Sequence, residues 1–221
     1  MVVKSNKPGD LFESLNNKHN FHQIDGSYGC GFGENNNIVF DYCCSVLGMK
    51  EDDYFIVLNP DVIIKPCMIK ILIEYMERDR INLAAINLFK DEAEEVYDNS
   101  IRQFPSLLQF VKSFLGFNND SLLDKNQLTS SIEVDWAAGS FLAFRASHYK
   151  ALKGFDEKYF MYCEDIDICY RSCLVGERVT YFPDVKAIHL AKHENRKLFS
   201  KHFYWHVSSV FRFFFGKIKS Y

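Results

Sequence analysis

The sequence has no long apolar run and no large excess of either charge, and each absence excludes a class of protein. No stretch approaches the ~20 apolar residues that a membrane-spanning helix needs. The chain has 26 basic and 29 acidic residues and a formal net charge of -3, which gives no reason to expect a nucleic-acid partner. Its opening, Met1–Asn6, turns polar at once, so no secretory signal is visible. We therefore expect a cytoplasmic protein, in solution or peripheral on the inner face of the plasma membrane.

Familiar metal-binding and phosphate-binding patterns are also missing. The seven cysteines include no C-x-x-C pair, and without a secretory signal they indicate reduced thiols. Cys163, Cys169 and Cys173 precede His189 in the same part of the chain, which leaves a zinc site as a minor alternative. The glycine-rich segment Gly26–Gly33 matches neither the P-loop nor the dinucleotide-binding pattern.

Apolar residues are plentiful, at 48% of the chain with 16% aromatic, and they are arranged in short periodic segments. Strands are predicted at Met1–Ser5, Tyr54–Leu58, Leu83–Leu88, Val179–Phe182 and Val185–His189, with Tyr54–Leu58 as a buried parallel strand. Helices are predicted from Leu11, from Glu34 to Leu47, over Met68–Met76 and over Phe104–Leu115. This alternation of strands and helices predicts a doubly wound α/β fold.

Asp61 stands at the end of a predicted strand. In open α/β sheets ligands bind beyond the carboxyl ends of the strands. A carboxylate there can hold Mg²⁺ or Mn²⁺ against a diphosphate. The sequence Asn59-Pro60-Asp61 also suits a turn that caps the following helix. The tripeptide alone does not decide between a metal-binding carboxylate and a helix cap.

Three carboxylates crowd into Glu164–Asp167, between two aromatic segments. Such charges repel one another unless something compensates them, and a carboxyl group in apolar surroundings gains the raised pKa of a general base. The alternative is an acid-rich helix N-terminus in which Asp167 pairs with Arg171. We expect both, with Asp167 structural and Glu164 and Asp165 facing the site.

Two histidines follow the last predicted strand. His189 comes directly after the apolar Val185–Ile188, so it is the better candidate for a metal or phosphate ligand, although a lone histidine is more often a packing residue. His193 lies in a polar stretch, and we expect it to be exposed.

Taken in their order along the chain, these segments resemble the family-2 glycosyltransferases of the GT-A fold. Within that family, the resemblance is strongest to the bacterial rhamnosyltransferases of O-antigen assembly. The matching motifs are Gly31–Asn37, Leu58–Asp61, Val134–Ser140, Gly154–Glu157, Tyr159–Arg171 and Ala187–His189. Each motif is weak alone, but their order over nearly the whole chain is highly specific. The resemblance implies a Rossmann-like, mostly parallel sheet flanked by helices in residues 1–202, followed by an aromatic and basic C-terminal helix in residues 203–221.

The resemblance also implies roles for individual residues. Asp61 matches the metal-binding carboxylate of the DxD-type element, and His189 matches the histidine that assists metal or diphosphate binding. Asp165 matches the catalytic base, with Glu164 beside it. The nucleotide-sugar and acceptor pocket would comprise Ser5, Asn6, Gly31, Phe32, Asn37, Asn59, Trp136, Gly139 and Ser140.

The implied reaction is transfer of a sugar with inversion, assisted by Mg²⁺ or Mn²⁺. The donor would be dTDP-L-rhamnose and the acceptor a saccharide on polyprenyl diphosphate. Contact of the aromatic C-terminal segment with a membrane would suit such an acceptor. The alternative for this segment is a helix packed on the domain or on a second subunit.

Some positions depart from the family pattern. The sequence opens at what resembles the second strand, so roughly 30 residues, about one strand–helix–strand unit, are expected to be missing. Ser5 stands where an aspartate is usual, and Gly29 where an asparagine is frequent. A catalytically impaired remnant or a non-catalytic partner subunit is therefore the alternative to an active enzyme. The spacing of the Glu-Asp and Asn-Pro-Asp motifs disfavours a different nucleotide-sugar enzyme.

Overall fold

The computed structural model describes residues 1–10, 12, 20–106, 123–190 and 201–218. The helices are α2 (Phe32–Ser45), α3 (Pro66–Asp79), α5 (Ala146–Ala151), α6 (Glu164–Leu174) and α7 (Lys201–Ile218), with a 3-10 turn at Lys125–Gln127. The strands are β1 (Val2–Ser5), β2 (His22–Asp25), β3 (Tyr54–Leu58), β4 (Val62–Ile64), β5 (Leu83–Phe89), β6 (Ile101–Arg102), β7 (Ile132–Val134), β8 (Trp136–Ala137), β9 (Phe141–Arg145) and β10 (Val179–His189). The helices predicted from Leu11 and over Phe104–Leu115 fall mainly or partly outside the described residues.

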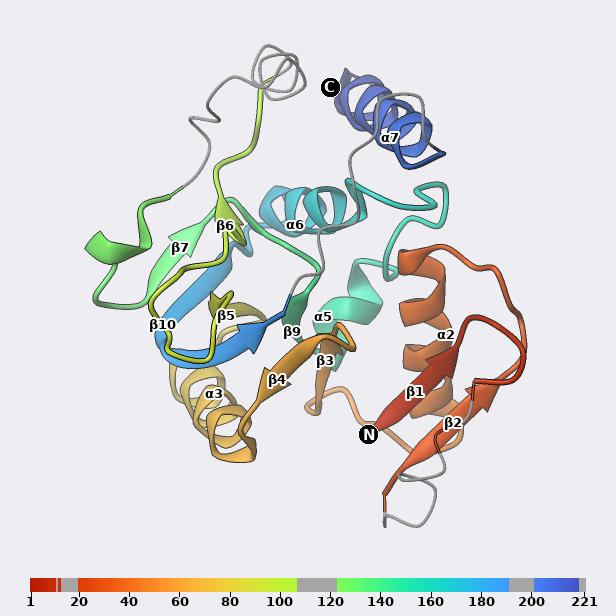
Figure 1. Cartoon of the computed structure of the whole chain (residues 1–221), viewed down its shortest axis with the longest axis horizontal. Helices are drawn as coiled ribbons and strands as arrows, with labels where there is room; N and C mark the ends of the chain where they lie inside the picture. Colours follow the sequence, from red (N-terminus) through yellow and green to blue (C-terminus); the bar gives the residue numbers. More distant parts are fainter. Residues whose placement is uncertain (11, 13–19, 107–122, 191–200, 219–221) are drawn as a thin grey trace.

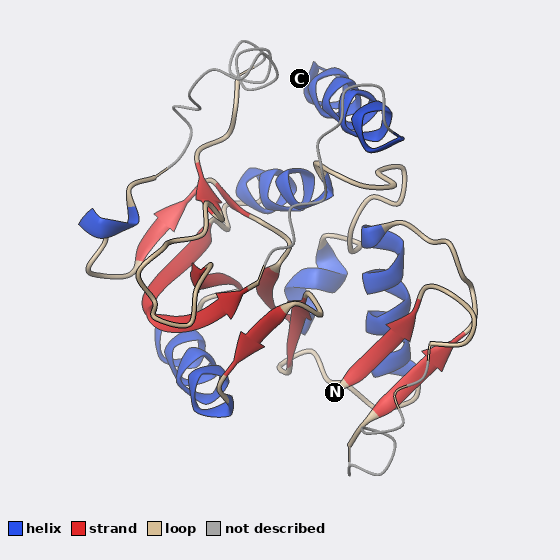
Figure 2. Ribbon diagram, viewed as in Figure 1, coloured by secondary structure: helices blue, strands red, loops and turns tan. Residues whose placement is uncertain are grey.

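The main sheet has the strand order β3-β9-β5-β10-β4, with β7 added to β10. Every residue of β5 is buried, and alternate residues of this strand enter two hydrophobic clusters. One cluster contains Leu72 and Met76 of α3, and the other contains Ile166 and Ile168 of α6. The helices therefore cover both faces of the sheet (Figures 1 and 2), and the predicted α/β fold is confirmed.

The strand directions differ from the mostly parallel arrangement that was expected. In the main sheet β10 runs parallel to β5, whereas β9 is antiparallel to both β3 and β5, and β10 is antiparallel to β4 and β7. The other parallel pair, β1 with β2, forms a separate sheet. The sheet is mixed because β9, which comes late in the chain, inserts between β3 and β5.

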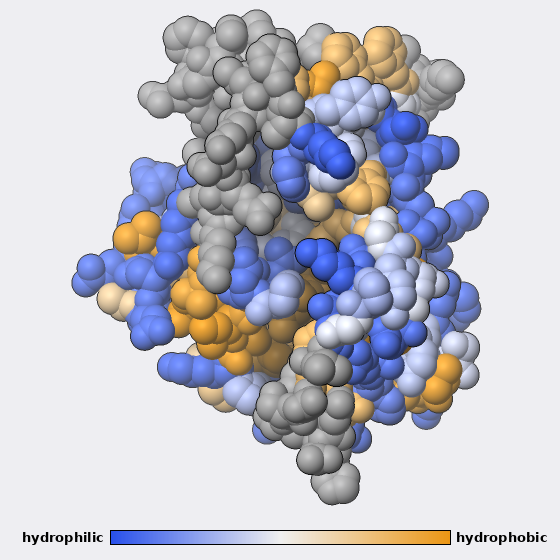
Figure 3. Space-filling view, turned by 45° about the vertical axis from the view of Figure 1, so that its right-hand side comes forward, coloured by the Kyte–Doolittle hydropathy of each residue, from blue (hydrophilic) through white to orange (hydrophobic). Residues whose placement is uncertain are grey.

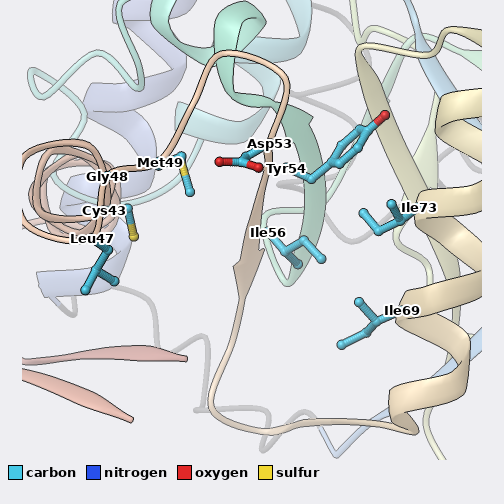
Figure 4. A pocket seen from close by; sticks show the side chains of 9 residues that line it. All are labelled: Cys43, Leu47, Gly48, Met49, Asp53, Tyr54, Ile56, Ile69 and Ile73. Carbon is cyan, nitrogen blue, oxygen red and sulfur yellow. The ribbon is translucent and has the colours of Figure 1, made fainter. Parts of the chain in front are cut away.

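Strand β3 was predicted as a buried parallel strand, and this was wrong. It is the last strand in its sheet, paired antiparallel with β9, and only Phe55 and Val57 are buried. No strand within the described residues pairs with its other side. That side opens on a hollow of about 480 Å³ between α2 and α3 (Figure 4), lined by Cys43, Leu47, Gly48, Met49, Asp53, Tyr54, Ile56, Ile69 and Ile73.

Strand β10 joins the two extended segments that were predicted separately. Its pairing with β5 shifts register between Phe182 and Lys186. Pro183 lies in this interval and has no N–H for the ladder, which favours an irregularity there. Beyond it the register places His189 opposite Val62 of β4, and so brings the histidine to the segment that carries Asp61.

The C-terminal helix α7 packs beside α6 (Figure 1). Phe213 is 2% exposed, Ser209 donates a hydrogen bond to the Met161 carbonyl at 2.9 Å, and the rings of Trp205 and Phe160 are 4.6 Å apart. The helix spans Lys201–Ile218, and the division of the chain between residues 202 and 203 stays a prediction. Among the described residues, no helix has both the length and the hydropathy to cross a membrane.

Candidate active site

The acidic segment forms the start of helix α6. Glu164 and Asp165 are its first two residues, and Tyr162 and Cys163 before it have φ angles of 71° and 66°. This left-handed conformation costs a non-glycine residue about 1–2 kcal/mol. The surrounding structure therefore holds a strained turn at the point where the two carboxylates enter the helix.

Asp165 is held by backbone donors. One carboxylate oxygen accepts from the Gly139 N–H at 3.1 Å and the other from the Ile166 N–H at 2.9 Å. Burial raises the pKa of Asp165, although these hydrogen bonds and the charge of Arg102 act in the opposite direction. Because the carboxylate is fixed and its pKa is raised, Asp165 has the properties of a general base.

Glu164 lies beside this base and is almost completely enclosed. It is 6% exposed, and its Oε2 atom has no hydrogen-bond partner among the described residues. Burial and then the neighbouring charge of Asp165 raise the pKa of Glu164. Because the charge of Asp165 acts on Glu164, the ionisation of one carboxyl group depends on that of the other.

The glycines around Asp165 permit close approaches. A Cβ atom on Gly139 would lie 3.0 Å from the Phe32 ring and 3.6 Å from the Asp165 Cβ, and one on Gly31 would lie 2.5 Å from the Phe160 carbonyl oxygen. The Phe32 N–H donates to that same carbonyl at 3.0 Å. The motifs around Gly31 and Gly139, far apart in sequence, therefore meet beside the carboxylates.

A second polar centre lies where β4 and β10 meet. His189 has its Nε2 atom 3.4 Å from Asp61 Oδ1 and its Nδ1 atom 2.5 Å from Asp98 Oδ2. The bond to Asp98 raises the pKa of His189. Burial alone would raise the pKa of Asp98, but the bond to His189 lowers it. The imidazole is thus held between two carboxylates.

The groups at this second centre fit a divalent cation. Asp61 Oδ1 is buried, and its 3.4 Å contact with His189 Nε2 is long, so a cation between the two groups would satisfy the oxygen better. The bond from Nδ1 to Asp98 leaves Nε2 turned toward Asp61, as in histidines oriented to bind a metal. No group of three metal-binding side chains exists within the described residues, so a ligand's own oxygens would have to complete the coordination.

One backbone segment connects the two centres. The Asn59 N–H, two residues before Asp61, donates to the Ser140 carbonyl at 3.0 Å. Ser140 follows Gly139, whose N–H binds Asp165. The Ser140 side chain is 5% exposed and its Oγ has no partner among the described residues. A short backbone path through Asn59, Ser140 and Gly139 therefore connects the segment of Asp61 with Asp165.

Four other predicted pocket residues have structural contacts. Asn6 exchanges two hydrogen bonds of 3.0 Å with the Cys30 backbone, and Ser5, 1% exposed, accepts from Gln23. Asn37 bonds both backbone groups of Phe155 and the Tyr149 hydroxyl, so it clamps α2 to the Gly154–Glu157 turn. The Trp136 indole donates to the Gln103 carbonyl at 3.0 Å.

Asp167 has the structural contacts that were predicted for it. Its carboxylate lies 2.7 Å from Arg171 one turn later. Arg171 also donates to the carbonyls of Leu152 and Gly154, which ties α6 to the end of α5. Cys163 and Cys169 are buried in the core, whereas His189 contacts Asp61 and Asp98, so the described residues do not assemble the alternative zinc site.

Sequence reasoning missed two residues of the site. Asp98 orients His189, and the Arg102 guanidinium lies 5.3 Å from the Trp136 ring and exerts its charge on Asp165. Asp98 comes from the loop after β5 and Arg102 from the two-residue strand β6, and neither segment has a periodicity that would place a side chain. The sequence gives little signal for Asp98, because it is one of five acidic residues between positions 91 and 98.

Proteins of two bacterial species have sequences similar to that of this chain. The rhamnosyltransferase WbbL of Escherichia coli (strain K12) is 41% identical over 214 residues, which cover 96% of this chain and 81% of that protein. The N-acetylglucosaminyl-diphospho-decaprenol L-rhamnosyltransferase of Mycobacterium tuberculosis (strain ATCC 25618 / H37Rv) is 32% identical over 169 residues, 73% of this chain and 55% of that protein. No family profile matches the chain.

Among solved structures, GalNAc-T7, crystallised with UDP, GalNAc and Mn²⁺, aligns with a TM-score of 0.52. The alignment covers 76% of this chain and 32% of that one, at 12% identity, so the likeness concerns the fold alone. The likeness to WbbL extends over almost the whole chain and includes the segments that build the site. The chain therefore belongs to the bacterial rhamnosyltransferases of glycosyltransferase family 2, which have the GT-A fold.

Proposed function

We propose that this protein transfers L-rhamnose from dTDP-L-rhamnose, with inversion, to a saccharide carried on polyprenyl diphosphate in cell-surface polysaccharide synthesis. The observation that carries the proposal is 41% identity to a rhamnosyltransferase over 96% of the chain. The mycobacterial relative is named for a diphospho-decaprenol acceptor, which supports a lipid-linked acceptor here. A non-catalytic remnant is disfavoured because the polar centres around Asp165 and Asp61 are both present.

Asp165 acts as the base in this proposal. Its carboxylate takes the proton of the acceptor hydroxyl while that oxygen attacks the anomeric carbon from the face opposite the diphosphate. The bond to the diphosphate oxygen breaks and its electron pair leaves with the diphosphate. The Gly139 and Ile166 N–H groups keep the carboxylate oriented, and a single displacement inverts the configuration without a covalent enzyme intermediate.

Asp61 and His189 would hold Mg²⁺ or Mn²⁺ on the diphosphate side of the site. The cation would neutralise charge that develops on the leaving diphosphate. Asp61 Oδ1 and the Nε2 atom of His189 lie 3.4 Å apart, so both can turn toward a shared ion. Asn59 and Ser140 lie between this side and Asp165, where the donor sugar would be positioned.

The direct test is a transfer assay with the purified chain, Mn²⁺, dTDP-L-rhamnose and a polyprenyl-diphosphate-linked saccharide. We expect rhamnosylated product with inverted anomeric configuration, and weaker binding of UDP-glucose than of dTDP-L-rhamnose in calorimetry. If neither nucleotide sugar binds in the presence of Mn²⁺, the chain is not an enzyme of this kind. The assay therefore decides between the active enzyme and the non-catalytic alternative.

Asp98 has a supporting role that can be tested separately. Asp98→Ala removes the acceptor that orients His189, and loss of such a partner weakens metal binding about 10–100-fold. We expect the Mn²⁺ concentration for half-maximal transfer to rise by this factor, while Asp98→Asn, which keeps a hydrogen-bond acceptor, restores part of the affinity.

Glu94→Gln is the matched control for Asp98, since Glu94 is an acid of the same loop that pairs with Lys186 at 2.8 Å on the surface. Its Mn²⁺ dependence is expected to equal that of the wild type. Equal Mn²⁺ dependence in the Asp98→Ala variant would show that His189 does not need this partner to bind the ion.

We place the reaction at the inner face of the plasma membrane, where a polyprenyl-linked acceptor and a cytoplasmic nucleotide sugar meet. This placement rests on the proposed acceptor and on the aromatic and basic composition of the C-terminal segment. Fractionation of cells that express the chain tests it, with recovery in the membrane pellet and release by high salt as the expected result.

A further inference from the structure

Helix α7 exposes a row of aromatic side chains. Tyr204, Phe211 and Phe215 are 70%, 54% and 61% exposed. They are separated by seven and four residues, which places them on one side of the helix, and the rings of Phe211 and Phe215 stack with centroids 6.2 Å apart. We refer to these three side chains as the aromatic face of α7.

The opposite side of α7 attaches the helix to the rest of the protein. Ser209 and Phe213 are buried there, and Ser209 bonds to Met161. Phe211 and Phe215 also line a hollow beside Tyr159 and Leu174, but more than half of each Phe side chain remains exposed. Figure 3 shows hydrophobic atoms at the upper edge of the molecule, the level at which Figure 1 places α7. Contiguous exposed apolar groups of this kind mark a contact surface.

Positive charge accompanies the aromatic face. Seven Lys and Arg residues and one Glu follow Leu190, whereas the whole chain has 26 basic and 29 acidic residues. Within α7, Lys201 and Arg212 are exposed, and their spacing of eleven residues lines them up beside the aromatic face. The helix sequence contains no Asp or Glu. An anionic surface is the complement of this arrangement.

We propose that α7 binds the surface of a membrane that contains anionic lipids. Tyr204, Phe211 and Phe215 would enter the headgroup region, while Lys201 and Arg212 would meet lipid phosphates. A second copy of the chain fits less well, because a two-fold contact through this face would bring like charges together. The inference rests on the proposed function in one respect, since it explains how the chain reaches a lipid-linked acceptor.

The experiment is sedimentation of the full chain with phosphatidylcholine vesicles and with vesicles of phosphatidylcholine and phosphatidylglycerol. We expect binding to the anionic vesicles that weakens at high salt. The double variant Phe211→Ser, Phe215→Ser removes most of the apolar contact and is expected to bind about tenfold less or weaker still. Arg212→Glu is expected to lose the preference for anionic vesicles.

The double variant Val46→Ser, Val175→Ser is the matched control. These side chains are 60% and 65% exposed and lie outside α7, so vesicle binding should equal that of the wild type. Circular dichroism of the Phe variant should show an unchanged melting temperature. Equal binding by the Phe variant, or light scattering that shows a dimer dissociated by the Phe substitutions without vesicle binding, would overturn the proposal.

A transfer assay separates this inference from the proposed function. With a water-soluble acceptor, the wild type and the Phe variant are expected to have equal rates, because the aromatic face lies outside the site around Asp165. Absence of transfer by both would contradict the proposed function, whereas vesicle binding would still be decided by the sedimentation data.

Discussion

The variant Asp165→Asn is expected to lose transfer by about 10²–10⁴-fold while retaining donor binding. The asparagine cannot take a proton from the acceptor hydroxyl, and general-base catalysis contributes an effect of this size. Donor affinity should remain close to that of the wild type, because the proposed ligands of the cation that holds the diphosphate are Asp61 and His189 and do not include Asp165. The measurements are the rate under saturating donor and the dissociation constant of dTDP-L-rhamnose with Mn²⁺.

Asp167→Asn is the matched control, since Asp167 lies one turn along the same helix and pairs with Arg171. That substitution is expected to lower the melting temperature and to keep the rate within a few-fold of the wild type. The melting temperature of Asp165→Asn should move by only about 4 °C, because removal of a buried charge offsets the loss of one accepted hydrogen bond. Unchanged turnover in Asp165→Asn would refute its role as the base.

The pH dependence of the transfer rate of the wild type provides a second test of Asp165. Burial raises the pKa of Asp165 above its ordinary value, so the base becomes protonated at a higher pH than an exposed aspartate. Transfer should therefore fall as the pH drops through this raised value. Glu164 and Asp165 titrate together, so the fall of the transfer rate at low pH reflects both groups. The Glu164→Gln variant should therefore show this fall at a lower pH.

The variant Asp61→Asn is expected to have the second largest effect, a loss of roughly 100-fold in kcat/KM that follows from weakened cation binding. Asn keeps the size of the side chain but removes the charge that faces His189. Donor affinity should become nearly independent of Mn²⁺, whereas in the wild type Mn²⁺ strengthens it. Calorimetric titration of the donor with and without Mn²⁺ measures this difference.

Asp184→Asn serves as the control for Asp61, because Asp184 is an exposed acid on β10, the strand that also carries His189. It should leave both kcat/KM and the Mn²⁺ dependence unchanged. An equal response of the two variants would point to a general charge effect and against cation binding at Asp61.

Local patterns in the sequence predicted much of the fold. The apolar runs at β3 and β5 and the periodic segments of α2 and α3 lie close to where they were predicted. However, the periodicity of apolar residues does not predict whether a strand pairs with a parallel or an antiparallel neighbour. Strand β3 was misread because β9, which follows it by more than eighty residues, pairs with it in the antiparallel sense. Long-range pairing of this kind depends on topology and not on local propensity.

The candidate site likewise contains residues that local sequence could predict and residues that it could not. Asp61, Glu164, Asp165 and His189 stand next to strand ends or helix starts, so their positions could be inferred. Asp98 could not be, because its place beside His189 depends on a loop that returns to the end of β5, where the Asp98 N–H bonds to Leu88. Asn37 looked like a ligand-binding amide, yet its side chain is used in bonds to Phe155 and Tyr149.

The open side of β3 also affects how the protein behaves in the test tube. An unpaired strand flanked by apolar side chains is a template for intermolecular pairing and fibril formation, and proteins usually protect such edges with charges or prolines. Tyr54–Leu58 contains neither, although Asp53 lies directly before it. Concentrated preparations of this chain should therefore gain thioflavin fluorescence on storage, and a lysine in place of Leu58, the exposed residue of this strand, should slow the formation of fibrils.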